Sequence, residues 1–341
     1  MAASYAGMEV IIVHTGQHYD EKMAGIFFKQ FNLAPDHIIE LEHASPVKQV
    51  GEIMIRLSEL LETIDPHWVM CVGDVNSTLA TALVANKMNL SVFHLESGLR
   101  SFDKAMPEEW NRLVTDRLCE KLFVTEQSGI ENLLHEHTEE TKIHFVGNTM
   151  IDTLVAFETD IEAAGILEKL NVSTGAYILL TLHRPSNVDT AEGLQKLIGL
   201  MKDLPAEYKI VFPVHPRTWK QLQLNGQDGD LQALDNVIIT EPLDYFAFQK
   251  LIKHSVVVIT DSGGIQEEST FRQVPCLTLR ENTERPSTII QGTNTLVAFD
   301  SHIILKHVRD IKEGRYKKGT IPQLWDGHAT ERILSIIAAT E

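Results

Sequence analysis

The sequence predicts an α/β protein with two doubly wound domains, each a parallel sheet covered by helices on both faces. Short apolar runs alternate with longer amphipathic stretches almost from end to end, as parallel strands alternate with crossover helices. The chain of 341 residues is longer than most single domains. A polar segment at Asn171–Gly175 separates two such series, so we expect the domain junction near residues 155–175.

The first series contains five candidate strands, at residues 9–14, 68–72, 91–95, 121–125 and 143–146. Helices are predicted at 47–64, behind Ser45 as cap and Pro46 as first helical residue, and at 77–87 after Asn76. The second series has strands at residues 177–182, 209–214, 237–240, 256–260 and 275–279. A last helix is predicted at 329–339, after the break at Trp325–Gly327.

Composition excludes several classes of function. The net charge of −17, without a basic stripe, argues against nucleic acid as a partner. Three widely spaced cysteines in apolar contexts, Cys71, Cys119 and Cys276, indicate buried thiols in a reducing compartment. No segment has the length of a membrane span and the first residues lack the pattern of a signal peptide, so a cytoplasmic location is the default expectation. Nicotinamide, P-loop and histidine metal motifs are missing from the sequence, which disfavours redox and metal chemistry and predicts no cofactor.

The segment Thr260–Ser269 predicts an anion site. It follows an apolar strand and continues as a helix, so the N–H groups around Ser262, Gly263 and Gly264 point where a phosphate would lie. Glu267 or Glu268, one turn later, is placed to accept hydrogen bonds from a ribose. The alternative is an ordinary Gly-Gly turn with solvated glutamates.

Three carboxylates follow adjacent strands of the first domain and suit general acid or base catalysis, because clustered, partly desolvated acids have raised pKa values. They are Asp74, Glu96 and Glu108. The alternative for Asp74 is an N-cap, and that for Glu108 is a charge at a helix start after Pro107. Glu96 lies directly on a buried strand, where an acid is costly without a partner or a function.

Cationic residues follow strands of the second domain. His183 and Arg184 end one strand and could contact phosphate oxygens, and His215 has the same character. Arg280 and Arg285 lie on the loop beside the Gly-Gly turn. The alternatives are a structural strand-end histidine and arginines that pair with neighbouring glutamates.

Seven motifs occur in the order found in the non-hydrolysing UDP-N-acetylglucosamine 2-epimerases, and the chain resembles that family over most of its length. They are Thr15–Tyr19, Gly73-Asp74 with Ser77-Thr78, His94–Arg100, Pro107–Glu109 with Asn111-Arg112, His183-Arg184, Asp261–Glu268 and Arg280–Pro286. The resemblance implies two Rossmann-like domains in a GT-B arrangement with an interdomain cleft, and a homodimer. The implied domains are residues 1–160 with a final helix 328–341 packed back on them, and residues 161–327, which bind the nucleotide.

The resemblance also implies an activity: reversible conversion of UDP-N-acetylglucosamine to UDP-N-acetylmannosamine, supplying cell-surface polysaccharide synthesis without a cofactor or metal. In such a reaction C2 loses a proton as UDP leaves C1, and the resulting 2-acetamidoglucal recombines with UDP in the opposite C2 configuration. Matching catalytic positions are Asp74, Glu96, Glu108 and His183, with the carboxylates assigned jointly to the proton at C2. Matching substrate-binding positions are Arg112, Arg184, Phe248, Ser262, Gly263, Gly264 and Glu268, and an effector site is expected at Gln17, His215 and Arg285.

One departure from the family pattern concerns the beginning of the chain. Members open with a strand that ends in Gly-Thr-Arg-Pro-Glu, whereas this sequence begins near the end of the helix that follows. We therefore expect the strands at 9–14 and 68–72 to lack their usual neighbour, with lower stability and activity unless a longer product exists. Two other classes stay open: a GT-B glycosyltransferase, which has no need of the three carboxylates, and a nucleotide-sugar-binding protein of weak activity.

Overall fold

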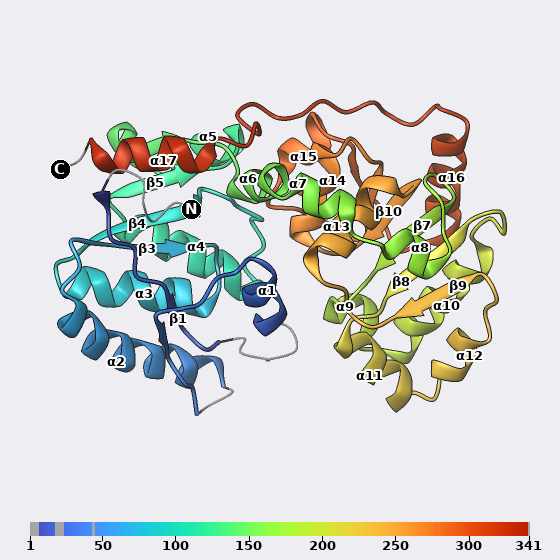
Figure 1. Cartoon of the computed structure of the whole chain (residues 1–341), viewed down its shortest axis with the longest axis horizontal. Coiled ribbons are helices and arrows are strands. Elements are labelled where there is room, and N and C mark those ends of the chain that lie inside the picture. The colour runs from blue at the N-terminus through green and yellow to red at the C-terminus, as the bar shows by residue number, and fades with distance from the viewer. Residues whose placement is uncertain (1–6, 18–23, 43–44, 340–341) are drawn as a thin grey trace. The chain divides into compact units, whose positions relative to one another are not determined.

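The computed structural model describes residues 7–17, 24–42 and 45–339, and it divides the chain into two compact units. Unit 1 consists of residues 1–152 and 323–341, and unit 2 of residues 153–322 (Figure 1). The chain thus leaves unit 1 inside helix α6 (Thr149–Ala156), slightly before the boundary at 160 expected from the sequence. It returns before the final helix.

Unit 1 is built on a four-stranded parallel sheet in the order β3-β4-β5-β6. Its strands are β3 (Trp68–Val72), β4 (Ser91–Ser97), β5 (Lys121–Val124) and β6 (Ile143–Phe145). The helices are α2 (Pro46–Ile64), α3 (Asn76–Lys87), α4 (Pro107–Leu118) and α5 (Gln127–His135), with a short 3-10 turn at Glu140–Lys142. These bounds agree closely with the runs predicted from the sequence, because buried parallel strands are continuous apolar segments.

The beginning of the described chain is less regular than predicted. Only Val13–His14 (β1) of the apolar run 9–14 forms a strand, and it pairs with β2 (His37–Ile38) in a separate two-stranded sheet. Helix α1 (Ala24–Gln30) lies between them in sequence. Val10, Ile11 and Ile12 are exposed. β3 pairs only with β4 among the described strands.

The last helix, α17 (Ala329–Ala338), packs on the sheet of unit 1 (Figure 1). Ile333 and Ile337 contact a cluster that includes Phe93 and Phe123 from β4 and β5. The Asp152 carboxylate accepts hydrogen bonds from the first N–H groups of α17, those of Ala329 at 3.0 Å and Thr330 at 2.6 Å. Asp152, the last residue of unit 1 before the chain enters unit 2, therefore caps α17, the helix with which the chain ends in unit 1.

Unit 2 is a six-stranded parallel sheet in the order β12-β11-β10-β7-β8-β9. Numbered within the unit, this is the 3-2-1-4-5-6 order of a Rossmann sheet read from the other edge. The strands are β7 (Tyr177–Thr181), β8 (Lys209–Pro213), β9 (Val237–Thr240), β10 (Val257–Thr260), β11 (Cys276–Thr278) and β12 (Asn294–Leu296). The helices are α7 (Glu158–Ala163), α8 (Ile166–Leu170), α9 (Pro185–Val188), α10 (Ala191–Asp203), α11 (Pro216–Leu224), α12 (Asp228–Gln232), α13 (Tyr245–His254), α14 (Gly263–Phe271), α15 (Pro286–Ile290) and α16 (Ser301–Lys312).

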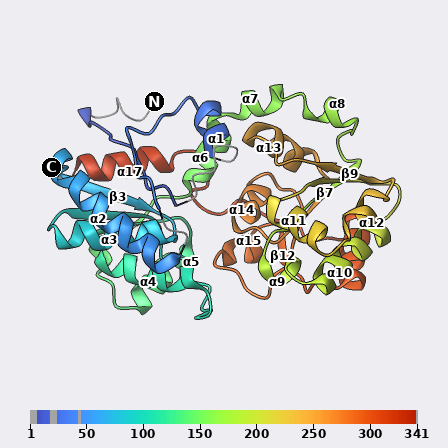
Figure 2. The same ribbon diagram turned by 90° about the horizontal axis from the view of Figure 1, so that it is seen from below.

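Both faces of this sheet are covered by helices. Ile178 and Leu180 of β7 pack into the cluster that contains α10, whereas Tyr177 and Leu179 pack into the cluster that contains α13. Figure 2 shows α10 and α13 on opposite sides of the strands. The side chains of one strand alternate between two buried layers, which confirms the predicted doubly wound α/β class.

Two further expectations can be compared with the described residues. The three cysteines are free and buried, as predicted. Among the described helices, none has both the length and the apolar character needed to cross a membrane.

Candidate functional site

The strand order of unit 2 reverses between β7 and β10, which lie side by side at the centre of its sheet. Ligands of open α/β sheets bind at the carboxyl ends of the strands beside such a point. β7 leads directly to His183 and Arg184, and β10 leads directly to Asp261 and Ser262. The sequence motifs expected to bind a diphosphate thus meet at the place where the topology predicts a ligand.

Asp261 holds the segment after β7 in place. Its fully buried carboxylate accepts hydrogen bonds from the N–H groups of His183 (3.1 Å) and Arg184 (2.8 Å) and from Nδ2 of Asn187 (2.9 Å). It also lies 3.0 Å from Nδ1 of His183. Burial alone would raise the pKa of Asp261, but the hydrogen bonds and the His183 ring outweigh burial and lower it. Asp261 is therefore an ionised anchor, and sequence analysis singled it out only as the start of the turn.

The first turn of α14 has main-chain N–H groups that can bind a ligand. The Ser262 N–H donates to Oγ1 of Thr260 at 3.0 Å, and the Ser262 side chain does not cap the helix. Of the three predicted N–H groups, those of Gly263 and Gly264 in the first turn are therefore the ones without an intrahelical partner. Glycine at position 263 also leaves room for the Arg285 guanidinium, since a Cβ there would lie 2.8 Å from Nη1 of Arg285.

Arg285 is held beside this turn by acidic neighbours. Its Nε lies 2.7 Å from Oε2 of Glu267, and its Nη1 pairs with Glu284. Arg280 pairs with the same Glu284 at 2.8 Å. Burial would raise the pKa of Glu284, but the two arginines lower it well below its usual range. The alternative of paired arginines is thus observed, and the pairing places the Arg285 guanidinium against Gly263.

The predicted effector residues are distributed over both units. The His215 ring lies 5.1 Å from that of His183 in unit 2, where Arg285 also lies. Gln17 belongs to unit 1, and its Oε1 accepts a hydrogen bond from the Ser77 N–H at the start of α3, at 2.8 Å. The effector role of these three residues stays a prediction.

Glu268 and Phe248 lie on the neighbouring helices α14 and α13. Burial raises the pKa of Glu268, and a hydrogen bond with Gln249 offsets only part of this effect, so the net result is a pKa of about 7. Phe248 is half-buried and packs against the cluster that contains Ala247 and Leu251. A carboxylate and an aromatic ring are therefore available on the α13 and α14 side of the unit 2 sheet.

In unit 1, Asp74 follows β3 and is paired with Arg112. Nη2 of Arg112 donates to Oδ2 of Asp74 at 2.5 Å, and Nδ2 of Asn111 donates to its main-chain oxygen at 2.8 Å. The alternative role of Asp74 as a helix cap is not observed, because α3 begins after Val75 without a side-chain cap. Arg112 is buried, so its guanidinium holds the Asp74 carboxylate from the interior of unit 1.

Glu96 interrupts β4. Its φ is 69°, a left-handed conformation that is uncommon for a residue other than glycine, and the register with β5 shifts between Leu95 and Ser97. The carboxylate is half-buried and faces the turn after the neighbouring strand β3, since a Cβ built on Gly73 would lie 3.9 Å from Oε2 of Glu96. Strained conformations of this kind cluster at functional sites, where the surrounding structure holds them.

Glu108 and Glu109 begin α4 with different environments. The half-buried Glu108 side chain forms no hydrogen bond or ion pair with any described residue. The buried Glu109 carboxylate instead accepts hydrogen bonds from the Ser101 N–H (2.8 Å), the Phe102 N–H (2.9 Å) and Nη1 of Arg112 (2.9 Å). Glu109 was not among the site residues predicted from the sequence, and it fixes the loop before α4. Glu108 is available to a ligand.

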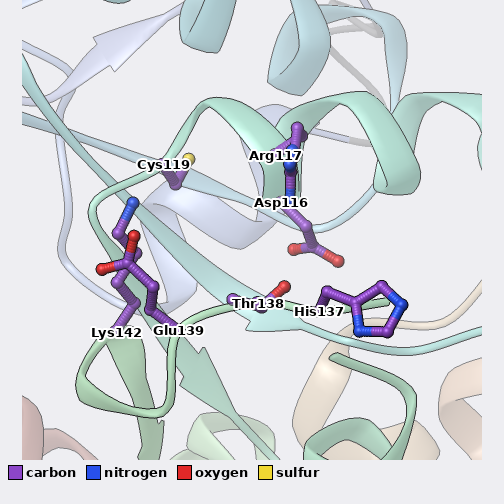
Figure 3. A pocket seen from close by; sticks show the side chains of 7 residues that line it. All are labelled: Asp116, Arg117, Cys119, His137, Thr138, Glu139 and Lys142. Atoms are coloured by element: carbon purple, nitrogen blue, oxygen red, sulfur yellow. The ribbon is translucent and has the colours of Figure 1, made fainter. Parts of the chain in front are cut away.

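A separate cavity of about 250 Å³ lies at the other end of α4 (Figure 3). Its lining consists of Asp116, Arg117, Cys119, His137, Thr138, Glu139 and Lys142. None of the predicted site residues is among them. The strand-end carboxylates therefore lie outside this cavity.

The comparisons with known proteins agree with this geometry. The family model described as UDP-N-acetylglucosamine 2-epimerase matches residues 2–338. The chain belongs to this family. The resemblance noted in the sequence is thereby confirmed.

Individual members of the family are similar over most of their length. A UDP-N-acetylglucosamine 2-epimerase of Methanococcus maripaludis is 38% identical over 334 residues, covering 96% of this chain and 90% of the relative. A UDP-2,3-diacetamido-2,3-dideoxy-D-glucuronate 2-epimerase of Pseudomonas aeruginosa is 34% identical over 304 residues, covering 88% and 83%. The crystal structure of the Methanocaldococcus jannaschii UDP-GlcNAc 2-epimerase, in complex with UDP-GlcNAc and UDP, matches with a TM-score of 0.89 at 36% identity. That match covers 99% of this chain and 94% of the other.

Proposed function

We propose that the chain is a non-hydrolysing isomerase that interconverts UDP-N-acetylglucosamine and UDP-N-acetylmannosamine by inverting C2. The observation that carries this proposal is the set of three strand-end carboxylates in unit 1. Asp74 and Glu96 are held on neighbouring turns, and Glu108 has no competing partner among the described residues. Transfer of a sugar to an acceptor, the glycosyltransferase alternative, has no use for three acids near C2.

The proposed mechanism is an elimination followed by a re-addition. A carboxylate removes the C2 proton while the bond between C1 and the diphosphate oxygen breaks, and the electron pair of the C–H bond forms the C1=C2 double bond of a 2-acetamidoglucal. UDP then adds back to C1, and a carboxylate delivers a proton to the opposite face of C2. We assign the proton steps jointly to Asp74, Glu96 and Glu108, because closely placed acids titrate as a set.

The residues of unit 2 are proposed to hold UDP as it leaves and returns. The N–H groups of Gly263 and Gly264 at the start of α14 favour an anion, and His183, oriented by Asp261, is proposed to contact the diphosphate. Glu268 is proposed to accept hydrogen bonds from the ribose, and Phe248 to lie against the uracil. Negative charge develops on the diphosphate as the C1–O bond breaks, so these groups stabilise the transition state more than the substrate.

Other features of the proposal follow from the family. We propose a cytoplasmic homodimer that needs no cofactor and supplies cell-surface polysaccharide synthesis. The Pseudomonas aeruginosa relative, 34% identical, favours a second candidate substrate: a UDP-linked sugar acid with acetamido groups at C2 and C3. The same carboxylates would act on C2 of either sugar.

The test is incubation with UDP-N-acetylglucosamine in deuterated water, followed by NMR of C2 in both sugar nucleotides. We expect deuterium at C2 of the product, because a carboxylate exchanges its proton with solvent before returning it. Epimerisation with retention of the original hydrogen would refute the elimination. A parallel incubation with the diacetamido sugar acid distinguishes the candidates, and absence of epimerisation with both would refute the activity.

A further inference from the structure

His94 lies at the centre of a buried hydrogen-bond network in unit 1 that the proposed chemistry does not use. It belongs to β4, two residues before Glu96, and its side chain is fully buried. Nδ1 lies 2.6 Å from Oδ1 of Asp116 on α4, and Nε2 lies 2.8 Å from the main-chain oxygen of Gly73. The ring therefore spans from a helix to the turn that carries Asp74.

Asp116 extends the network to the turn after Glu96. Its Oδ2 accepts hydrogen bonds from the Gly98 N–H at 3.1 Å and from Nη2 of Arg100 at 2.7 Å. Arg100 in turn pairs with Glu136 at 2.8 Å. Oδ2 of Asp116 is therefore held by the charged Arg100, and Oδ1 is directed at His94.

The network joins the turn at Gly73, which lies beside the Glu96 carboxylate, to Gly98, two residues after Glu96. Gly73 and Gly98 both have positive φ, 69° and 78°, and a Cβ on Gly98 would lie 2.5 Å from the main-chain oxygen of Gly129. The Gly73 N–H donates to the Leu95 oxygen at 3.0 Å, immediately before Glu96. A shift of either turn would therefore move Asp74 relative to Glu96.

Both ring nitrogens of His94 face acceptors, a carboxylate and a carbonyl. A neutral imidazole carries one N–H, so only the imidazolium donates in both directions. Burial alone would lower the pKa of His94, but the Asp116 carboxylate raises it to about 9. The titratable groups that face the ring are Asp116 from α4 and Cys71 from β3, with Arg100 on the far side of Asp116.

We propose that His94 is a positioning residue for the C2 chemistry: its doubly protonated ring ties the Gly73 carbonyl to Asp116 and so fixes Asp74 relative to Glu96. This inference rests on the proposed epimerisation. His94 itself touches neither the sugar nor the nucleotide in this account, and it acts through the two turns.

Two substitutions separate positioning from simple structural support. In His94→Gln the amide nitrogen lies near the place of Nε2, so it keeps the donor to Gly73 and loses the one to Asp116. In His94→Asn the amide nitrogen lies near the place of Nδ1, so it keeps the donor to the buried Asp116 charge and loses the one to Gly73. A structural role predicts that His94→Asn is the milder change in every assay, because a buried carboxylate oxygen that lacks a donor is costlier than a carbonyl oxygen that lacks one.

The positioning role predicts opposite rankings for stability and turnover. We expect His94→Asn to melt at the higher temperature but to lose kcat by roughly ten- to a hundred-fold, since a displacement of about 1 Å can cost that much. His94→Gln should melt lower yet retain more of the wild-type kcat. UDP affinity, which depends on unit 2, should be unchanged in both variants. Should kcat follow the melting temperatures instead, His94 is only structural.

Trp325→Phe is the matched control in unit 1. Nε1 of Trp325 is buried and donates to the main-chain oxygen of Thr125 at 2.9 Å, after a strand that carries none of the three carboxylates. This variant should lose stability and keep kcat. A loss of kcat equal to that of His94→Asn would show that destabilisation alone explains both results.

A measurement without turnover keeps the two proposals distinguishable. Wild-type protein that fails to epimerise any substrate would refute the proposed function, and 15N spectra of histidine-labelled protein would then decide on the network. We expect two protonated ring nitrogens for His94 at pH 7, absent from the spectrum of His94→Asn. A His94 ring with one protonated nitrogen would overturn the positioning proposal.

Discussion

At the scale of single residues, neighbours in sequence have opposite roles. Glu108 and Glu109 both follow Pro107 in the first turn of α4. The half-buried Glu108 carboxylate is free of described partners, while the buried Glu109 carboxylate binds two main-chain N–H groups and Arg112. The helix turns by about 100° between consecutive residues, so one side chain enters the loop and the other faces away from it.

This difference predicts a clean separation between two matched variants. Glu109→Gln removes one of the two carboxylates that pair with the buried Arg112 and replaces an acceptor oxygen of the loop by an NH2 group, so it should lower the free energy of unfolding by about 1–3 kcal/mol. Glu108→Gln should change stability by less than about 0.5 kcal/mol and lower kcat by ~10²–10⁴, as removal of a general acid or base does. Chemical denaturation and initial-rate kinetics measure both effects. Wild-type turnover in Glu108→Gln would remove Glu108 from the catalytic set.

At the scale of elements, each unit contains a buried acid whose carboxylate accepts hydrogen bonds from the segment that follows a strand. These hydrogen bonds hold the functional groups at the strand ends in position. Asp261 after β10 binds the segment after β7, and Asp116 on α4 binds the segment after β4. Burial would raise the pKa of both acids, but hydrogen bonds and the charged or polar neighbours outweigh burial and lower it: His94 and Arg100 beside Asp116, and His183 and Asn187 beside Asp261. The strand ends are thus held by ionised carboxylates that a ligand does not contact.

The start of α14 offers a test of the phosphate site. Ser262→Asp places a carboxylate next to the first-turn N–H groups, where repulsion between like charges should lower UDP affinity by at least ~tenfold. The fold should survive, because an acid is favoured at a helix N-terminus. Isothermal titration with UDP measures the effect.

The control for this variant lies in the same unit. Ser301→Asp adds the same charge to the first turn of α16, which Asp300 already caps. UDP affinity should stay at the wild-type value in Ser301→Asp. Equal affinities of the two variants for UDP would move the phosphate site away from α14.

At the scale of the whole molecule, buried titratable groups make stability depend on pH in a predictable direction. The pKa of His94 is raised from 6.5 to about 9, so between these values the folded chain holds more protons than the unfolded one. The pKa of Glu268 is raised from 4.5 to about 7, which has the same sign over that lower range. Asp116 and Asp261 have lowered pKa values, so their contribution is present above 3.8 and is lost on acidification.

The raised pKa of His94 should therefore make the free energy of unfolding decline as pH rises from about 7 to 9. Urea denaturation at pH 5, 7 and 9 measures the free energy of unfolding. His94→Asn should remove most of the decline between pH 7 and 9, while Trp325→Phe should keep it. A wild-type protein equally stable at pH 7 and 9 would contradict the assigned charge of His94.

The sequence determined most of the regular elements. The runs at 68–72 and 237–240 are strands with the predicted bounds, because both are short runs of apolar and β-branched residues, which favour the extended conformation. β2 and β12 escaped prediction, since they have only two and three residues and His37 and Asn294 carry no apolar signal. The run 9–14 was predicted as one strand, but only Val13 and His14 pair with a neighbour. Pairing depends on a partner strand, which local pattern does not supply.

The sequence also determined which motifs follow the strands, because parallel strands bring their carboxyl ends to one edge. The tertiary structure decided which members of each motif hold the site and which are left for a ligand. Arg112 turned Asp74 from a candidate helix cap into an ion-paired acid, and Asp261 fixed His183 across a distance of many residues. His94 looks like an ordinary strand residue until Asp116 and Gly73 are seen on either side of its ring. Charge and hydrogen-bond partners come from distant parts of the chain, so only the folded arrangement assigns these roles.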